Sequence, residues 1–166
     1  AVATVPHDGV SVPFGRPIFL VGMMGAGKTT IGRGLARELG CAFVDLDQVL
    51  EARCGVRIPV IFDIEGEAGF RQRESRLLAE YAHQQGVVVA TGGGIVTVED
   101  NRRLLREHGT VIYLQAELDE LVRRTARDRN RPLLATGDPR QTLSTLMRQR
   151  DPLYQEVADL RLGTGT

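Results

Sequence analysis

The 166-residue sequence carries 21 basic and 21 acidic side chains, so its formal net charge is zero. A balanced charge gives no reason to expect a nucleic acid or an anionic membrane surface as a partner. The sequence has no run of eighteen apolar residues and no basic start followed by an apolar stretch, which predicts neither a membrane span nor a signal peptide and favours a cytoplasmic location. Cys41 and Cys54 are isolated, which favours reduced thiols over a disulfide or a zinc site.

The first 17 residues hold three prolines and two glycines and show neither a helical nor an alternating apolar pattern. Such a composition is typical of a flexible leader. The remaining length suits one compact domain, so we expect a single domain over residues 18–166.

The motif GMMGAGKT at residues 22–29 stands between an apolar run at 18–21 and a helical pattern at 29–39. It matches the phosphate-loop pattern G-x-x-x-x-G-K-[ST] in its strand-to-helix context. Glycines let successive backbone N–H groups converge on an anion, and the helix N-terminus adds partial positive charge. We therefore expect Lys28 to reach the β- and γ-phosphates of a nucleotide and Thr29 to offer its hydroxyl to Mg²⁺.

A second short strand at 42–44 ends in Asp45-Leu46-Asp47, ahead of a helical pattern. Ligands of open parallel sheets gather at the carboxyl ends of strands, where the phosphate loop also lies. The two aspartates alternate along an extended segment and so are expected to point in different directions, one of them toward Mg²⁺ and the other toward a second substrate. Asp47 is equally suited to cap the following helix.

Residues 58–81 show a helical pattern in which Arg71 and Glu74 are three positions apart and share a face. One interpretation is a solvated ion pair of little energetic value. The other is a partly apolar pocket, walled by Phe62 and Phe70, in which an arginine fork binds a carboxylate ligand. The residues alone leave both open.

An apolar strand at 87–91 runs directly into Gly92, Gly93 and Gly94. Three successive glycines favour close approach of a ligand to the backbone over a simple flexible turn. We then expect a helix near 100–107 and a strand at 110–114.

Beyond a helix at 118–127, three alternating arginines precede a loop that ends near Pro139. This basic loop is either a solvated face or a lid that closes over a transferred phosphate. A helix at 138–150, a new helix beginning at 150–154 and a last strand at 159–162 complete the pattern. Five apolar strands alternating with helices predict an α/β domain with a parallel sheet covered on both faces.

Six motifs, in this order and approximate spacing, resemble the shikimate kinase family over roughly residues 17–162. They are GMMGAGKT at 22–29, DLD at 45–47, GFRQRE at 69–74, TGGG at 91–94, RNRPLL at 129–134 and RDPLY at 150–154. The resemblance implies a three-layer α/β/α P-loop kinase fold of the nucleoside-monophosphate-kinase type, with a five-stranded parallel sheet. It also implies a substrate-binding segment at about 47–81 and a lid at about 127–139.

The implied reaction is transfer of the γ-phosphate of ATP to the 3-hydroxyl of shikimate, in aromatic amino acid biosynthesis. The resemblance assigns shikimate to Asp47, Arg71, Glu74, Gly92, Gly93, Gly94, Arg150, Phe62 and Phe70. It assigns ATP to Gly25, Ala26, Gly27, Lys28, Thr29, Thr30, Arg124 and Arg131, and Mg²⁺ to Thr29 and Asp45. Lys28, Asp47 and Arg131 are the implied catalytic residues, with Arg124 near the adenine and Asp47 as acceptor of the hydroxyl proton.

The family pattern continues past the last strand into a loop that packs on adenine and a terminal helix, whereas this sequence ends at residues 163–166. We expect this difference to affect the adenine side and not the acceptor side. A kinase of another small hydroxy acid, such as gluconate, is disfavoured because it would not require the whole motif set. A nucleotide-binding module without turnover is disfavoured because the charged motif residues are all present. We expect a monomer with ATP and shikimate as its partners.

Overall fold

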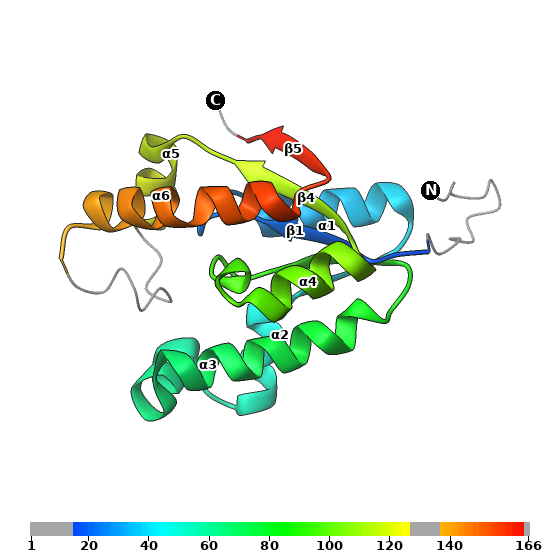
Figure 1. Ribbon diagram of the computed structural model, residues 1–166, viewed down its shortest axis with the longest axis horizontal. Coiled ribbons are helices and arrows are strands. Elements are labelled where there is room, and N and C mark those ends of the chain that lie inside the picture. Colours follow the sequence, from blue (N-terminus) through cyan, green and yellow to red (C-terminus); the bar gives the residue numbers. More distant parts are fainter. Residues whose placement is uncertain (1–14, 127–136, 165–166) are drawn as a thin grey trace.

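A computed structural model describes residues 15–126 and 137–164 of the chain (Figure 1). The predicted leader lies largely outside the described residues. Arg131 and most of the predicted lid also lie outside them, and their roles stay predictions. Among the described helices, none is long and apolar enough to cross a membrane.

The described strands form a five-stranded sheet in which every neighbouring pair is parallel. The strand order is β2-β3-β1-β4-β5. The strands are β1 (Ile18–Val21), β2 (Ala42–Asp45), β3 (Val87–Ala90), β4 (Thr110–Gln115) and β5 (Leu160–Gly163). The predicted parallel α/β sheet is therefore confirmed, and each strand begins within one residue of its predicted position.

Helices cover both faces of this sheet. Figure 1 shows α4 and α6 in front of the sheet and α1 behind it. The helices are α1 (Lys28–Leu39), α2 (Leu46–Cys54), α3 (Ile58–Ala82), α4 (Glu99–His108), α5 (Leu118–Thr125) and α6 (Pro139–Val157), with a 3₁₀ turn η1 (Ile95–Thr97) before α4. Strands β1 and β3 lie at the centre of the sheet, and their apolar runs are almost wholly buried, as expected of a strand covered on both sides.

The end of the chain differs from prediction in one element. A single helix, α6, runs from residue 139 to residue 157 with Pro152 inside it, where the sequence favoured two helices. Proline removes one backbone hydrogen bond and usually breaks a helix. Here the buried side chains of Arg150 and Tyr154 anchor the helix on either side of Pro152, so packing outweighs the missing bond.

Helix α3 bends at Gly66, whose backbone leaves the helical region with φ 73° and ψ 177°. The part after Gly66 carries Phe70, Leu77 and Leu78 into the core, together with the fully buried Glu74. The part before the bend reaches the core through Ile58 and Ile61, whereas Ile64, next to the bend, stays exposed. This arrangement brings a charged face of α3 to the carboxyl end of the sheet.

Candidate active site

The phosphate-loop motif forms the turn between β1 and α1. Gly25 and Gly27 adopt φ values of 85° and 98°, which side-chain-bearing residues rarely reach. Helix α1 begins at Lys28, directly after the left-handed Gly27, so the positive end of its dipole meets the loop. The ammonium group of Lys28 donates to the carbonyl oxygens of Gly22, at 2.5 Å, and Met23, at 3.1 Å, so it lies back over the loop.

Thr29 and Asp45 meet beside this loop. The Thr29 hydroxyl donates to Asp45 Oδ2 at 2.9 Å, joining the first turn of α1 to the end of β2. The other carboxylate oxygen, Oδ1, accepts from the backbone N–H groups of Asp47, at 3.0 Å, and Gln48, at 3.3 Å, and so caps helix α2. Asp45 therefore has a capping role and a position beside the phosphate loop.

The structure contradicts one expectation about this segment and excludes one alternative that the sequence left open. Helix α2 begins at Leu46, so Asp47 lies in its first turn, and the two aspartates do not alternate along one extended segment. Asp45, not Asp47, caps the helix. The physical reason is that Asp45 is the last extended residue, with φ −108° and ψ 114°, which is the backbone conformation that an N-cap requires.

A cluster of four charged side chains lies near the carboxyl ends of the strands. Its members are Asp47, Arg71, Glu74 and Arg150. Glu74 is fully buried and Arg150 is 3% exposed, and the Arg71 side chain is 13% exposed. Arg71 Nη1 donates to Glu74 Oε1 at 3.0 Å, while Nη2 donates to the more exposed Glu67 at 3.2 Å. The predicted i,i+3 pair is thus present, and its burial excludes the solvated interpretation. The charges of Asp47 and Arg150 also act on Glu74.

The three glycines after β3 make room for these charges. A Cβ on Gly92 would lie 2.7 Å from Glu74 Oε2 and 3.1 Å from Asp47 Oδ1. One on Gly93 would lie 3.3 Å from Arg150 Nη1, and one on Gly94 would lie 2.3 Å from Arg71 Nη2. Each glycine therefore faces at least one charged side chain at a separation that an added methyl group would disturb. The glycine run is the floor against which this cluster of charged side chains packs.

Several polar atoms of this charged cluster are buried and have no hydrogen-bond partner among residues 15–126 and 137–164. They are Arg71 Nε, Arg150 Nη1 and Glu74 Oε2. Burial raises the pKa of Glu74 to about 7; Asp47 adds to the rise, and Arg71 and Arg150 oppose it. Two unused guanidinium donors in a buried site suit a carboxylate ligand, and an unused carboxylate oxygen suits a hydroxyl.

Two aromatic rings pack beside this charged cluster. The rings of Phe62 and Phe70 pack with centroids 4.9 Å apart, and the guanidinium carbon of Arg71 lies 5.2 Å from the Phe70 centroid. The contact supports Arg71 from one face, as a cation–π pair. The structure thus places Phe62 and Phe70 beside Arg71, which is the arrangement that the pocket interpretation of residues 58–81 requires.

Tyr154 is a site residue whose role the sequence analysis missed. It is fully buried, and its hydroxyl donates to the carbonyl oxygen of Gly93 at 2.5 Å. The bond ties helix α6, which carries Arg150, to the glycine floor. Its sequence signal was the end of the RDPLY motif, but the partner is 61 residues away, which no local pattern reveals.

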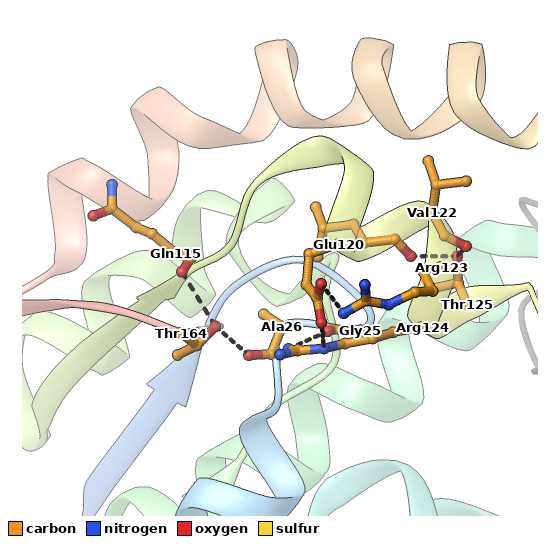
Figure 2. A network of polar contacts seen from close by, with 10 residues as sticks. Gly25, Ala26, Gln115, Glu120, Val122, Arg123, Arg124, Thr125 and Thr164 are labelled. Carbon is orange, nitrogen blue, oxygen red and sulfur yellow. Dashed lines mark hydrogen bonds and ion pairs between the residues drawn. The ribbon is translucent and has the colours of Figure 1, made fainter. Parts of the chain in front are cut away.

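Arg124 and Thr30 are two further residues that we expected to bind the nucleotide. Arg124, on α5, donates from Nη1 to the Gly25 carbonyl at 3.0 Å and from Nε to Glu120 at 2.8 Å, so it lies against the phosphate loop (Figure 2). Thr30 is exposed in the first turn of α1.

A cavity of about 840 Å³ lies between β4, α5 and α6. Its lining includes Met23 and Thr164 but none of Asp47, Arg71, Glu74 and Arg150.

The comparison with family models decides the assignment. A model described as shikimate kinase matches residues 24–166. The chain belongs to the shikimate kinase family. It is 67% identical over 164 residues to the shikimate kinase of Bordetella avium, covering 99% of this chain and 75% of that protein. The corresponding identity to the shikimate kinase of Bordetella pertussis is 63%, covering 99% of this chain and 74% of that protein, so the chain spans about three quarters of the length of these relatives.

Solved structures agree with the shikimate kinase assignment. The shikimate kinase of Acinetobacter baumannii, solved in complex with shikimate, superposes with a TM-score of 0.89 at 48% identity, covering 91% of this chain and 84% of that one. A gluconokinase from Sinorhizobium meliloti is similar at a TM-score of 0.50 and 17% identity, covering 93% and 86%. The second likeness shows the fold alone, whereas the first extends to the sequence. The P-loop kinase fold and the family prediction are both confirmed.

Proposed function

We propose that this chain carries out the reaction of its family, ATP plus shikimate giving shikimate 3-phosphate plus ADP, at the carboxyl end of the sheet. The observation that carries the acceptor assignment is the pair of buried guanidinium donors, Arg71 Nε and Arg150 Nη1, above the glycine floor. A small cyclic acid with three hydroxyls needs cationic donors for its carboxylate and acceptors for its hydroxyl groups. The pocket offers both.

Arg71 and Arg150 would hold the carboxylate of shikimate, and Asp47 and Glu74 would receive its hydroxyl groups. Burial of these charges supports the proposal, because a charge-assisted hydrogen bond is stronger where water is excluded. Glu74 and Phe70 would fix Arg71 before the acceptor arrives, by an ion pair and a ring contact. Phe62 extends that wall by packing against Phe70. A preorganised pocket of this kind loses less entropy on binding.

The phosphate loop would hold the phosphates of ATP through the backbone of Gly25, Ala26 and Gly27. Thr30 and Arg124 would contribute at its edge. Lys28 contacts two loop carbonyls in the described chain, and in the complex it would turn to the β- and γ-phosphates. Because phosphoryl transfer requires little covalent help, alignment of the acceptor hydroxyl with the γ-phosphate and neutralisation of charge would supply most of the rate.

Thr29 and Asp45 suit a magnesium ion. Their oxygen atoms lie 2.9 Å apart, and Mg²⁺ is commonly held by one or two protein oxygens together with phosphates and water. No group of three or more His, Cys, Asp or Glu side chains that would suit a metal occurs among the described residues, which agrees with a metal held largely by the nucleotide. When bound, the ion would neutralise charge on the phosphates.

Asp47 is our candidate for the group that accepts the proton of the attacking hydroxyl. Arg131, which lies outside the described residues, is our candidate for a lid cation over the transferred phosphate. A cytoplasmic location and a monomeric state also stay predictions. They rest on the sequence alone.

A coupled assay of ADP release with Mg-ATP tests the assignment, with shikimate, gluconate and no acceptor compared side by side. We expect release that depends on shikimate and falls at least tenfold in kcat/KM in Asp47→Asn, since that change removes a charged acceptor of hydroxyl groups. Release with gluconate alone would overturn the acceptor. Binding of ATP without release for any acceptor would favour the nucleotide-binding module that the motif set disfavours.

A comparison of KM and kcat in Asp47→Asn separates binding from proton transfer. If KM for shikimate rises and kcat is unchanged, Asp47 is a binding residue only. A fall in kcat at saturating shikimate would support the role in proton transfer. Glu51→Gln is a matched control, because Glu51 is an acidic residue of the same helix that accepts from the Ile58 N–H and lies outside the pocket.

A further inference from the structure

The phosphate loop is held from outside by two side chains that bind consecutive carbonyl groups. Arg124 donates to the Gly25 carbonyl at 3.0 Å, and the hydroxyl of Thr164 donates to the Ala26 carbonyl at 2.7 Å (Figure 2). Arg124 belongs to α5, whereas Thr164 directly follows β5 at the edge of the sheet. Two elements distant in sequence therefore meet at the same turn of the loop.

Thr164 is itself fixed in place. Its backbone N–H donates to the Gln115 carbonyl at 2.7 Å, which extends the ladder of β4 and β5 by one bond. Its hydroxyl lies 3.2 Å from the same carbonyl and closer, at 2.7 Å, to that of Ala26. A hydroxyl has one proton, so the shorter contact takes it while the backbone N–H satisfies Gln115. Thr164 is only 9% exposed, so water competes little for the bond.

The bond to Ala26 fixes the direction of a peptide group. The described residues contain no cis peptide bond, and in a trans peptide the carbonyl and the following N–H point in opposite directions. When Thr164 holds the Ala26 carbonyl on its own side, the N–H of Gly27 is turned to the other side. Gly27 is the left-handed residue ahead of α1, where its N–H is among those that a nucleotide phosphate would receive.

We propose that Thr164 is a positioning residue for the nucleotide: its hydroxyl holds the Ala26–Gly27 peptide in the orientation that binds phosphate. The inference rests on the proposed nucleotide site. It adds that the end of the last strand of the sheet, 138 residues from Ala26, sets the affinity of the loop for ATP and ADP. The carbonyl groups that Thr164 contacts, those of Ala26 and Gln115, belong to the phosphate loop and to β4, so we expect shikimate binding to be unaffected by this bond.

The test is titration calorimetry of the whole chain with ADP, with Thr164→Val and Thr164→Ser compared with the parent. Valine keeps the shape and removes the hydroxyl, whereas serine keeps the hydroxyl. We expect ADP affinity to fall roughly fivefold to tenfold in Thr164→Val and to return to within about twofold in Thr164→Ser. In kinetics, KM for ATP should rise in Thr164→Val while KM for shikimate stays unchanged.

Thr125→Val is the matched control. The Thr125 hydroxyl is also buried and also donates to a carbonyl, that of Leu121 within α5. The Thr125 methyl group faces Gly25 of the phosphate loop, and valine keeps that methyl group, so the variant removes only the hydroxyl. We expect a similar change in thermal stability and an unchanged affinity for ADP. Equal losses of affinity in Thr125→Val and Thr164→Val would overturn the inference, because the effect would then be one of general stability.

Two other outcomes of the titration would overturn the inference. An unchanged ADP affinity in a folded Thr164→Val would overturn the positioning role and leave the nucleotide site intact. Failure of the parent chain to bind ADP would overturn the nucleotide site itself, and this inference with it. Loss of affinity in Thr164→Val with rescue by serine supports the inference, since a purely structural role would not follow the hydroxyl group.

Discussion

The two halves of the site recognise their proposed ligands by different means. On the acceptor side, four charged side chains converge over three glycines, and two of them, Glu74 and Arg150, are almost wholly buried. On the nucleotide side, the loop offers backbone groups, which Arg124 and Thr164 orient from outside. Side-chain recognition depends on which residue is present, whereas backbone recognition depends on how the chain is held. Substitutions should therefore act directly on the first half and through geometry on the second.

The largest expected effect is that of removing the buried cation of the acceptor side. In Arg150→Met we expect kcat/KM for shikimate to fall roughly 100-fold, because a buried cationic donor is lost and Glu74 loses a neutralising charge. ADP affinity should change less than twofold, measured by calorimetry. Arg148→Met on the same helix is the control, since Arg148 is exposed. A parallel loss of ADP affinity in Arg150→Met would break the division between the two halves.

A smaller effect is expected from adding one methyl group to the glycine floor. In Gly94→Ala the new Cβ would fall 2.3–2.6 Å from the Arg71 guanidinium group, which is the movable end of a long side chain. Gly94 has φ −93°, so its backbone accepts alanine without strain. We expect Arg71 to shift, KM for shikimate to rise roughly tenfold and the melting temperature to change little.

Gly34→Ala provides the contrast for this experiment. Gly34 lies within α1, and apart from its chain neighbours and the nearby backbone of its own helix, no atom of the described residues lies within 4 Å of its added Cβ. Alanine is the better helix former, so we expect a gain in stability of about 0.5–1 kcal/mol and unchanged kinetics. Unchanged KM in Gly94→Ala would mean that Arg71 is not held where the acceptor carboxylate binds.

The sequence was sufficient for the features that are local. The phosphate loop, the five strands and the pairing of Arg71 with Glu74 follow from spacing within one element or one turn. The glycine run was interpreted correctly as a place of close approach, although the sequence suggested a ligand and the structure adds the charged side chains. Local periodicity and turn chemistry determine these features, so a single sequence reveals them.

The features that were missed depend on contacts between distant segments. Tyr154 meets Gly93, and Thr164 meets Ala26, across separations of 61 and 138 residues that no window of the sequence spans. Pro152 indicated a helix end, but tertiary packing of its neighbours keeps α6 continuous. Asp45, and not Asp47, is the N-cap of α2 because this helix begins two residues earlier than its sequence pattern predicts.

The smallest expected effect is a pH dependence of stability that the buried carboxyl group of Glu74 causes. Glu74 is one of two carboxylates that pair with Arg71, and the other, Glu67, is exposed. Burial raises the pKa of Glu74 from 4.5, its ordinary value, to about 7 in the folded chain. Between these two values the folded state binds more protons than the unfolded state, so the free energy of unfolding falls as pH rises from about 4.5 to about 7. Above pH 7 both states are ionised, and this contribution becomes constant.

Glu74→Gln should abolish that dependence, because glutamine does not titrate and has nearly the same shape. Relative to the parent chain without ligands, the variant should gain on the order of 1 kcal/mol of unfolding free energy between pH 5 and pH 8, measured by urea denaturation. Glu67→Gln is the matched control for loss of an ion pair, because it removes the other carboxylate partner of Arg71; the Glu67 side chain is 52% exposed, so the free energy of unfolding should change little. A difference between Glu74→Gln and the parent that does not change with pH would mean that water reaches this carboxylate in the folded chain, or that Arg71 moves to neutralise it. In that event the acceptor half would not be the preorganised, dry pocket that sets it apart from the nucleotide half.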